Sequence, residues 1–232
     1  MHVGGKLAFR GRRLIEDRGR LPFLIGGEDP PQLSALVPEG FETVEIEVGS
    51  GKGTFVLAAS EANPERFLLG IEAAPAYAQL AAEKLHRAGR TNAFLLVDNA
   101  KIFLKDRVAE HSVARLHVYY PDPWPKRRHR KRRFFSAEMP ETIARILRPD
   151  GYLLVATDNA CYAGQIVALL GSSCWLVRDE AEELRLLASG PGHGFSPTSF
   201  ERKYLEEGRI LRRSAWRSRI NSSTHREQGG PS

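Results

Sequence analysis

The chain has 232 residues, of which 42% are apolar, so it can bury one substantial core and form one domain or at most two. No stretch approaches the roughly 18 apolar residues that cross a bilayer. The two cysteines, Cys161 and Cys174, are too few for a disulfide framework, and we predict that they are small core residues in a reducing cytoplasm. The formal net charge of +6 and the pI near 9.5 favour a nucleic acid as partner over an acidic protein or a membrane.

Short apolar segments alternate with helix-like segments from residue 44 onward. The predicted order is strand 44–48, helix 54–60, strand 67–71, helix 75–88, strand 93–97, helix 100–108, strand 113–120, helix 135–147, strand 151–156, helix 160–170 and a strand that begins at residue 175. Strands that are apolar on both faces and alternate with helices indicate βαβ units, so we predict an α/β fold with a doubly wound, mostly parallel sheet. Ligands bind such sheets outside the carboxyl ends of the strands, so the residues that follow the strands are the candidates for a site.

The basic residues gather in three segments. Residues 1–30 hold six Lys and Arg against four acids, residues 201–232 hold eight against four, and residues 126–133 hold seven in eight positions. The rest of the chain has thirteen basic and twenty acidic residues, so the basicity is local and suits a polyanion held at one face. We predict a partly disordered basic arm over 1–40, one domain over 41–220 and a flexible tail over 221–232.

A glycine-rich turn, with Gly49, Gly51 and Gly53, follows the first predicted strand and leads into a helix. Glycines let the backbone pass close under a ligand, and the free N–H groups of a helix N-terminus favour a polar ligand edge. The turn is not a Walker A loop, because Ile46 stands where that motif needs its first Gly and Gly53 follows Lys52 where Ser or Thr is required. We expect the Lys52 side chain to face solvent without a role.

Glu72 ends the second strand about 20 residues after the turn, where a carboxylate can bind two vicinal ribose hydroxyls of either NAD or S-adenosylmethionine. Three features favour S-adenosylmethionine. The glycine spacing is Gly-x-Gly-x-Gly, and Glu47 lies in the first strand, where its carboxylate would face a cationic ligand. Asn99 and Ala100, after the third strand, offer an amide to an adenine edge. A surface acid on an edge strand is the alternative interpretation of Glu47.

Asp122 follows the fourth strand, in a segment that reads Pro-Asp-Pro-Trp-Pro and leads directly into the basic octet 126–133. The two flanking prolines restrict the backbone and leave the carboxylate little freedom. A plain turn is the alternative for this segment, and a solvated or disordered charge run is the alternative for the octet. Asp122 and the octet both follow a strand whose carboxyl end lies at the expected ligand crevice. We therefore predict a functional role for Asp122 and binding of a polyanion by the octet.

Two later motifs have less specific patterns. Asp158 lies in a Thr-Asp-Asn tripeptide, residues 157–159, that ends the fifth strand. This tripeptide can either cap the next helix or contact a substrate. Thr198, Ser199, Phe200 and Glu201 follow a segment rich in Gly and Pro, and by themselves they indicate a capping box or a junction between a loop and a helix.

Together these motifs resemble the tRNA (guanine-N7)-methyltransferase family. The resemblance extends over about residues 44–213 and is carried by residues 46–53, 70–72, 99–100, 121–133, 156–158 and 198–204. The Pro-Asp-Pro-Trp-Pro-Lys block joined to a basic run is the specific part, whereas the glycine turn and the following acid are general to the superfamily. Tyr120, where the family often has Phe, and Val48, where Ile is common, are small departures.

The resemblance implies the Rossmann-like fold of class I S-adenosylmethionine-dependent methyltransferases over 41–220. It further implies transfer of a methyl group to N7 of the tRNA variable-loop guanine at position 46. The sequence does not decide between a monomer and a homodimer, and the cytoplasmic location is the expectation drawn above from the cysteines. It surrounds S-adenosylmethionine with Glu47, Gly49, Gly51, Gly53, Glu72, Asn99, Ala100 and Asp122, and the RNA with Lys126, Asp158, Thr198, Ser199, Phe200 and Glu201. Asp122 is the candidate catalytic residue, because a carboxylate bound to guanine N1–H and N2–H stabilises the positive charge that forms on the ring.

Three alternatives stay open. The first is a methyltransferase of the same fold that acts on another RNA or on an exocyclic amine, although amine methylation usually uses an Asn/Asp-Pro-Pro-Tyr-like tetrad after the fourth strand. The second is a non-catalytic RNA-binding protein with a vestigial pocket, which the intact glycine turn, Glu72 and Asp122 argue against. The third is an NAD-dependent dehydrogenase.

Overall fold

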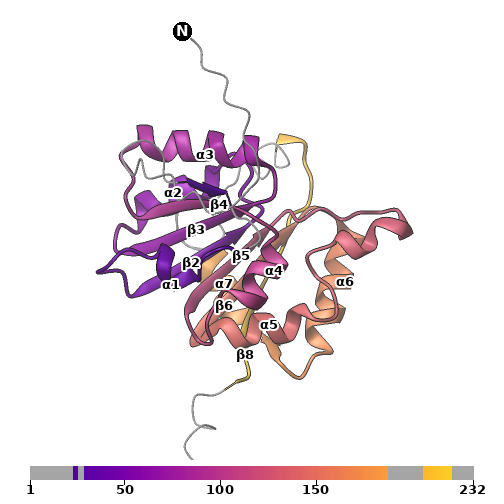
Figure 1. Cartoon of the computed structure of the whole chain (residues 1–232). Coiled ribbons are helices and arrows are strands. Elements are labelled where there is room, and N and C mark those ends of the chain that lie inside the picture. Colours follow the sequence, from indigo (N-terminus) through magenta and orange to yellow (C-terminus); the bar gives the residue numbers. More distant parts are fainter. Residues whose placement is uncertain (1–22, 26–28, 188–205, 221–232) are drawn as a thin grey trace, which may run out of the picture.

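The computed structural model describes residues 23–25, 29–187 and 206–220 (Figure 1). Within these residues, eight strands form one sheet in the order β1-β4-β3-β2-β5-β6-β8-β7. The strands are β1 (Phe23–Ile25), β2 (Thr43–Val48), β3 (Arg66–Glu72), β4 (Ala93–Val97), β5 (Val113–Tyr119), β6 (Leu147–Thr157), β7 (Leu176–Arg178) and β8 (Arg212–Ser218). The helices are α1 (Leu33–Leu36), α2 (Thr54–Ala62), α3 (Pro75–Arg87), α4 (Ala100–Asp106), the 3-10 helix η1 (Arg127–Arg132), α5 (Met139–Ile146), α6 (Ala160–Gly171) and α7 (Glu180–Leu187).

The predicted doubly wound, mostly parallel sheet is confirmed. β8 is antiparallel to both of its neighbours, β6 and β7, whereas β1 to β6 pair in parallel. After β1 at the edge of the sheet, the chain enters the middle of the sheet at β2, moves outward to β3 and β4, and then crosses to β5 on the other side of β2. The strand order therefore reverses between β2 and β5, which is where such sheets bind ligands.

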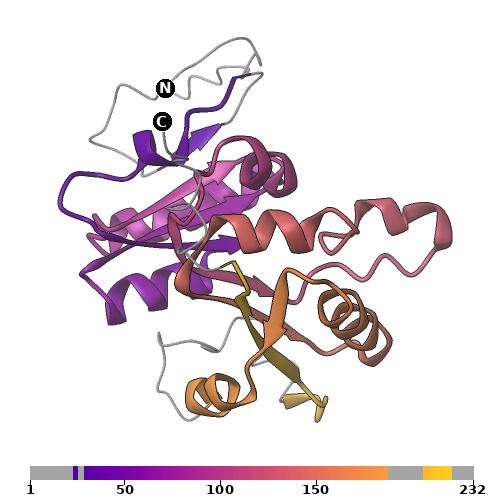
Figure 2. The ribbon, with the colours of Figure 1, turned by 90° about the horizontal axis from the view of Figure 1, so that it is seen from below.

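Helices cover both faces of the sheet, as Figures 1 and 2 show. One buried cluster joins the sheet to α1, α4, α5 and α6, and a second joins it to α2 and α3. Ile46, Leu69, Leu95 and Leu116 are fully buried, as expected for central strands that are apolar on both faces. Among the described helices, none is long and apolar enough to cross a membrane.

The folded unit begins before residue 41. β1 pairs with β4, and the α1 side chains Leu33 and Leu36 are buried in the first cluster. The predicted domain boundary at residue 41 therefore falls inside the folded unit, because these short apolar segments gain their stability from the sheet and not from their own pattern.

Other differences from the prediction concern α5, β8 and the cysteines. The predicted helix 135–147 begins only at Met139, because Phe134 and Phe135 pack edge-to-face in the core, with their ring centroids 5.2 Å apart. β8 was not predicted, since its arginines conceal the strand pattern around the buried Trp216. The prediction that Cys161 and Cys174 are core residues is wrong, because both are exposed.

Candidate active site

The residues that follow the parallel strands β2 to β6 lie along one edge of the sheet. The register pairs Val48 with Ile71 and Val118, so the glycine turn after β2 lies between the ends of β3 and β5. Glu72, Asp98, Asp122 and Asp158 stand at the ends of β3, β4, β5 and β6. Residues distant in the sequence are thus brought to the crevice where the strand order reverses. The predicted substrate residues 198–201 lie outside the described part of the chain.

The glycine turn has a left-handed backbone. Gly51 has a φ of 51° and Gly53 a φ of 70°, a region that other residues rarely enter. A Cβ on Gly51 would meet nothing within 4 Å, whereas one on Gly53 would lie 2.5 Å from the Cβ of Ala81 in α3. Gly53 therefore permits the close packing of α2 on α3, and Gly51 leaves open space at the carboxyl edge of the sheet. The Lys52 side chain is exposed, in agreement with the expectation.

Glu72 joins the turn to β3. Its Oε2 accepts a hydrogen bond from the Gly51 N–H at 2.8 Å, and its Oε1 accepts one from the Ala74 N–H, also at 2.8 Å. An ionised carboxylate has about four acceptor positions, so each oxygen retains one for a ribose hydroxyl. The backbone of the turn therefore fixes this carboxylate in the orientation in which it would meet a nucleoside.

Glu47 is a buried carboxyl group beside the turn. Glu47 is only 6% exposed to solvent, and its Oε2 has no hydrogen-bond partner within the described residues. Burial raises the pKa of Glu47 to about 8; the Ser50 hydroxyl opposes this shift and the negative charge of Glu72 adds to it. The alternative of a surface acid is therefore wrong. A buried carboxyl oxygen without a partner is costly unless a cation or a donor joins it, so this group would fit the ammonium of a bound amino-acid moiety.

The end of β4 offers both an amide and a carboxylate. Asn99 caps α4, and its Oδ1 accepts a hydrogen bond from the Lys101 N–H at 3.1 Å, while Ala100 is the first residue of that helix. The Oδ1 of Asp98 accepts from the Asn99 N–H at 2.6 Å, and its Oδ2 is buried with no partner among the described residues. Sequence reasoning placed Asp98 in this motif but gave its carboxylate no role, although an acid directly after a buried strand was the available signal. An unsatisfied acceptor there fits an exocyclic adenine amine.

Asp122 projects from a strained turn. Tyr120 and Trp124, on either side of it, have φ values of 51° and 38°, which are left-handed and uncommon for such bulky residues. Within the described chain, no hydrogen bond or ion pair engages the exposed Asp122 carboxylate. Backbone strain of this kind persists only where the surroundings impose it, and it is concentrated at functional sites.

The basic octet forms the ordered helix η1, at the end of an extension that projects from the sheet beside α6 (Figures 1 and 2). The guanidinium of Arg132 lies 5.1 Å from the centre of the Trp124 ring, and the His129 ring meets the same indole edge-on at 5.6 Å. The octet is therefore helical and not a disordered run, while the alternative of a solvated charge run stays open. Six cationic residues of this extension are exposed, namely Lys126, Arg127, Arg128, Arg130, Lys131 and Arg132.

Asp158 is held by arginines from the C-terminal part of the chain. Its Oδ2 lies 2.6 Å from Nη1 of Arg209, and its backbone carbonyl accepts a hydrogen bond from Arg212 at 3.2 Å. The following residue, Asn159, caps α6 through a hydrogen bond from the Tyr162 N–H. The capping interpretation thus holds for Asn159, and the Asp158 carboxylate is engaged by Arg209.

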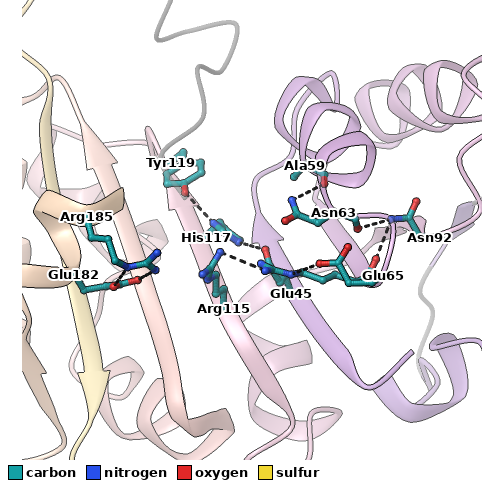
Figure 3. A network of polar contacts seen from close by, with 11 residues as sticks. Glu45, Ala59, Asn63, Glu65, Asn92, Arg115, His117, Tyr119, Glu182 and Arg185 are labelled. Carbon is teal, nitrogen blue, oxygen red and sulfur yellow. Dashed lines mark hydrogen bonds and ion pairs between the residues drawn. The ribbon is translucent and has the colours of Figure 1, made fainter. Parts of the chain in front are cut away.

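A buried polar network lies behind the site, where β2 pairs with β5 (Figure 3). Figure 3 shows Glu45 between His117 and Arg115, with the His117 Nε2 at 2.9 Å from Glu45 and the His117 Nδ1 at 2.8 Å from the Tyr119 hydroxyl. Burial lowers the pKa of His117, so the imidazole is neutral. Burial alone would raise the pKa of Glu45, but His117, Arg115 and Arg66 together lower it to about 2. Glu45 is therefore an ionised structural group and no part of the ligand crevice.

The residues present fit S-adenosylmethionine. The buried carboxyl group of Glu47 would suit its cationic amino acid, the oriented carboxylate of Glu72 would suit its ribose, and the unsatisfied acceptor of Asp98 would suit its adenine. The crystal structure of the antibiotic-resistance methyltransferase Kmr shares the fold, with a TM-score of 0.51, 17% identity, and coverage of 79% of this chain and 90% of that one. The chain thus has the Rossmann-like fold of that methyltransferase, with a crevice where the strand order reverses.

Comparison of sequences names the family. A family model described as "Putative methyltransferase" matches residues 42–212. The chain is 31% identical over 194 residues to the tRNA (guanine-N(7)-)-methyltransferase of Nitrosomonas eutropha, over 83% of this chain and 82% of the relative. It is 39% identical over 178 residues to the protein of the same name from Nocardia farcinica, over 74% of this chain and 65% of the relative. The chain belongs to the tRNA (guanine-N7)-methyltransferase family, so the resemblance is confirmed and a dehydrogenase is excluded.

Proposed function

We propose that this protein transfers the methyl group of S-adenosylmethionine to N7 of the variable-loop guanine at position 46 of tRNA. The observation that carries the proposal is the juxtaposition of Asp122 and η1. A free carboxylate stands at the switch point of the sheet, a few residues before a helix with exposed cations. This arrangement offers one group for a base edge and several for phosphates. The proposed tRNA substrate supports a cytoplasmic location for the enzyme.

The cofactor would be held by groups at the ends of β2, β3 and β4. Glu47 would pair with its ammonium, Glu72 would accept from its ribose hydroxyls, and Asp98 with Asn99 would meet its adenine. Bound S-adenosylmethionine supplies an electrophilic methyl group on a sulfonium. The chain then has to hold that methyl in line with the acceptor, so orientation contributes much of the rate.

The acceptor atom requires no general base. N7 of guanine has an exposed lone pair and carries no proton, unlike an exocyclic amine. Methylation makes the ring cationic, and a carboxylate that accepts from N1–H and N2–H becomes more favourable as that charge develops. Asp122 is the proposed catalytic residue in this role. Asp158 and residues 198–201 are the further substrate-binding residues that we propose, and Asp158 would first exchange its contact with Arg209 for one with RNA.

The tRNA would be held through its backbone. Lys126 and the outward side chains of η1 can each neutralise a phosphate, and the resulting release of counterions makes the affinity salt-dependent. These contacts would also offset the cost of unstacking the target base, which must leave its stack before N7 can meet the methyl group.

The direct test incubates the purified protein with labelled S-adenosylmethionine and bulk tRNA, and then identifies the modified nucleoside by mass spectrometry. We expect 7-methylguanosine, lost when position 46 of a tRNA transcript is changed to adenine. Asp122→Ala should abolish the transfer while the protein still binds the cofactor. An N2-methylated product would favour the amine alternative, and tRNA binding without transfer would favour the non-catalytic one. Turnover by Asp122→Ala at the wild-type rate would remove Asp122 from the mechanism.

A further inference from the structure

Arg133, the last residue of the basic octet, points inward and not toward solvent. Its Nε donates to the carbonyl of Pro123 at 2.6 Å, and its Nη2 donates to the carbonyl of Trp124 at 3.2 Å. Its Nη1 donates to the side-chain oxygen of Gln165 in α6. The guanidinium carbon also lies 4.9 Å from the centre of the Tyr162 ring. One side chain thus connects the turn around Asp122 to α6.

The turn needs a donor from outside itself. Three of its five residues are prolines, Pro121, Pro123 and Pro125, which have no N–H to donate. The turn also contains the left-handed Trp124, whose conformation costs on the order of 1–3 kcal/mol unless its surroundings hold it. A planar guanidinium has five N–H groups in a fixed fork, so it can bind two successive carbonyls and the Gln165 oxygen at once.

The two carbonyls bound by Arg133 belong to the residues that directly follow Asp122. Their orientation determines where the backbone places the Asp122 carboxylate, which has no hydrogen bond or ion pair among the described residues and interacts electrostatically with Tyr162. Arg133 is also the C-terminal cap of η1, because its N–H donates to the Arg130 carbonyl at 3.0 Å. The same residue therefore joins the tRNA-binding helix to the turn that carries the catalytic carboxylate.

We propose that Arg133 is a positioning residue for Asp122, a role that rests on the proposed function and separates Arg133 from the phosphate-binding residues of the octet. The role depends on the shape of the guanidinium and not on its charge. A lysine at this position keeps the positive charge but cannot bind both carbonyls and Gln165 together. Arg130, which is exposed, is the matched control, since its role depends on charge alone.

The test compares Arg133→Lys with Arg130→Gln. Arg133→Lys should lower kcat by about 10²-fold, because displacement of a catalytic group by about 1 Å has a cost of that size. Its Kd for tRNA and the salt dependence of that Kd should equal those of the wild type. Arg130→Gln should instead raise KM and Kd for tRNA and reduce the slope of log Kd against log salt by about one, with kcat retained at saturating tRNA.

Two results would overturn the inference. One is a wild-type kcat for Arg133→Lys, and the other is a loss confined to its KM and its Kd for tRNA. Thermal unfolding shows whether the variant is folded. If Arg133→Lys is unfolded, Gln165→Leu serves instead, because it removes the third acceptor while Arg133 stays in place. Gln165→Leu should lower kcat several-fold at an unchanged Kd for tRNA. An unaltered kcat would count against the positioning role of Arg133. If the wild type makes no 7-methylguanosine, the proposed function fails and the inference with it, whereas an active wild type with an equally active Arg133→Lys refutes the inference alone.

Discussion

Glu47 makes the stability of this protein depend on pH in a direction unusual for a carboxyl group. In the folded state its pKa is raised to about 8, whereas an exposed glutamate has a pKa of 4.5. Between these values the unfolded chain has lost a proton that the folded chain retains. The free energy of unfolding therefore falls as the pH rises from 4.5 to 8 and changes no further above 8.

The size of the effect follows from the shift. Each pH unit between the two pKa values removes about 1.4 kcal/mol, so the full interval removes about 5 kcal/mol at most. Glu47→Gln has nearly the same shape and does not titrate. Relative to the wild type, the variant should gain about 5 kcal/mol of stability between pH 4.5 and pH 9. It should also bind S-adenosylmethionine about tenfold more weakly or worse, because it lacks the charge that pairs with the ammonium.

Urea unfolding of both proteins at several pH values measures this difference directly, and isothermal titration calorimetry measures cofactor binding. The wild type and Glu47→Gln share every other titrating group. The difference between their unfolding free energies therefore isolates the contribution of Glu47. A difference that stays constant from pH 4.5 to pH 9 would refute the reasoning. A Gln variant that binds the cofactor as tightly as the wild type would refute the pairing with the ammonium.

Three further predictions concern packing, RNA binding and the buried network. Gly53→Ala should lower the free energy of unfolding by about 2–4 kcal/mol, because its Cβ would clash with α3; the control Gly49→Ala, which meets no atom within 4 Å, should cost only about 1 kcal/mol in the same urea titration. Replacing Arg127 and Arg128 by Gln should reduce the salt slope of tRNA binding by about two in filter-binding assays, and an unchanged slope would contradict the phosphate contacts. Glu45→Gln should destabilise the fold by about 1.5–3 kcal/mol at pH 7, since it removes the buried charge that pairs with the partly exposed Arg66 and Arg115. Because the pKa of Glu45 is lowered to about 2, its contribution to the free energy of unfolding is complete above pH 4.5 and is lost as the pH falls toward 2. The unfolding free energies of wild type and Glu45→Gln should therefore converge in acid, and a constant difference between them would exclude this role.

Much of the sheet and part of the site could be predicted from local pattern. Central strands are apolar on both faces, so β2, β3 and β4 were expected within a residue or two of their observed bounds. The glycine turn and the acids Glu47 and Glu72 could be placed at its carboxyl edge, because parallel strands bring their ends to the same side. β1 and β8 could not be predicted, since β1 is three residues long and β8 has three arginines around a tryptophan that only the sheet buries.

The sequence by itself determined the fold class, the family and the chemistry of the crevice, because those depend on residue types and on spacings along the chain. Only the tertiary structure decided how similar residues divide their tasks. Of seven cations in one octet, Arg133 turns inward to bind the carbonyls after Asp122 while others stay exposed, and Asp158 is engaged by Arg209. The reason is physical: a side chain's direction, burial and partners depend on segments far away in the sequence, which no local pattern contains.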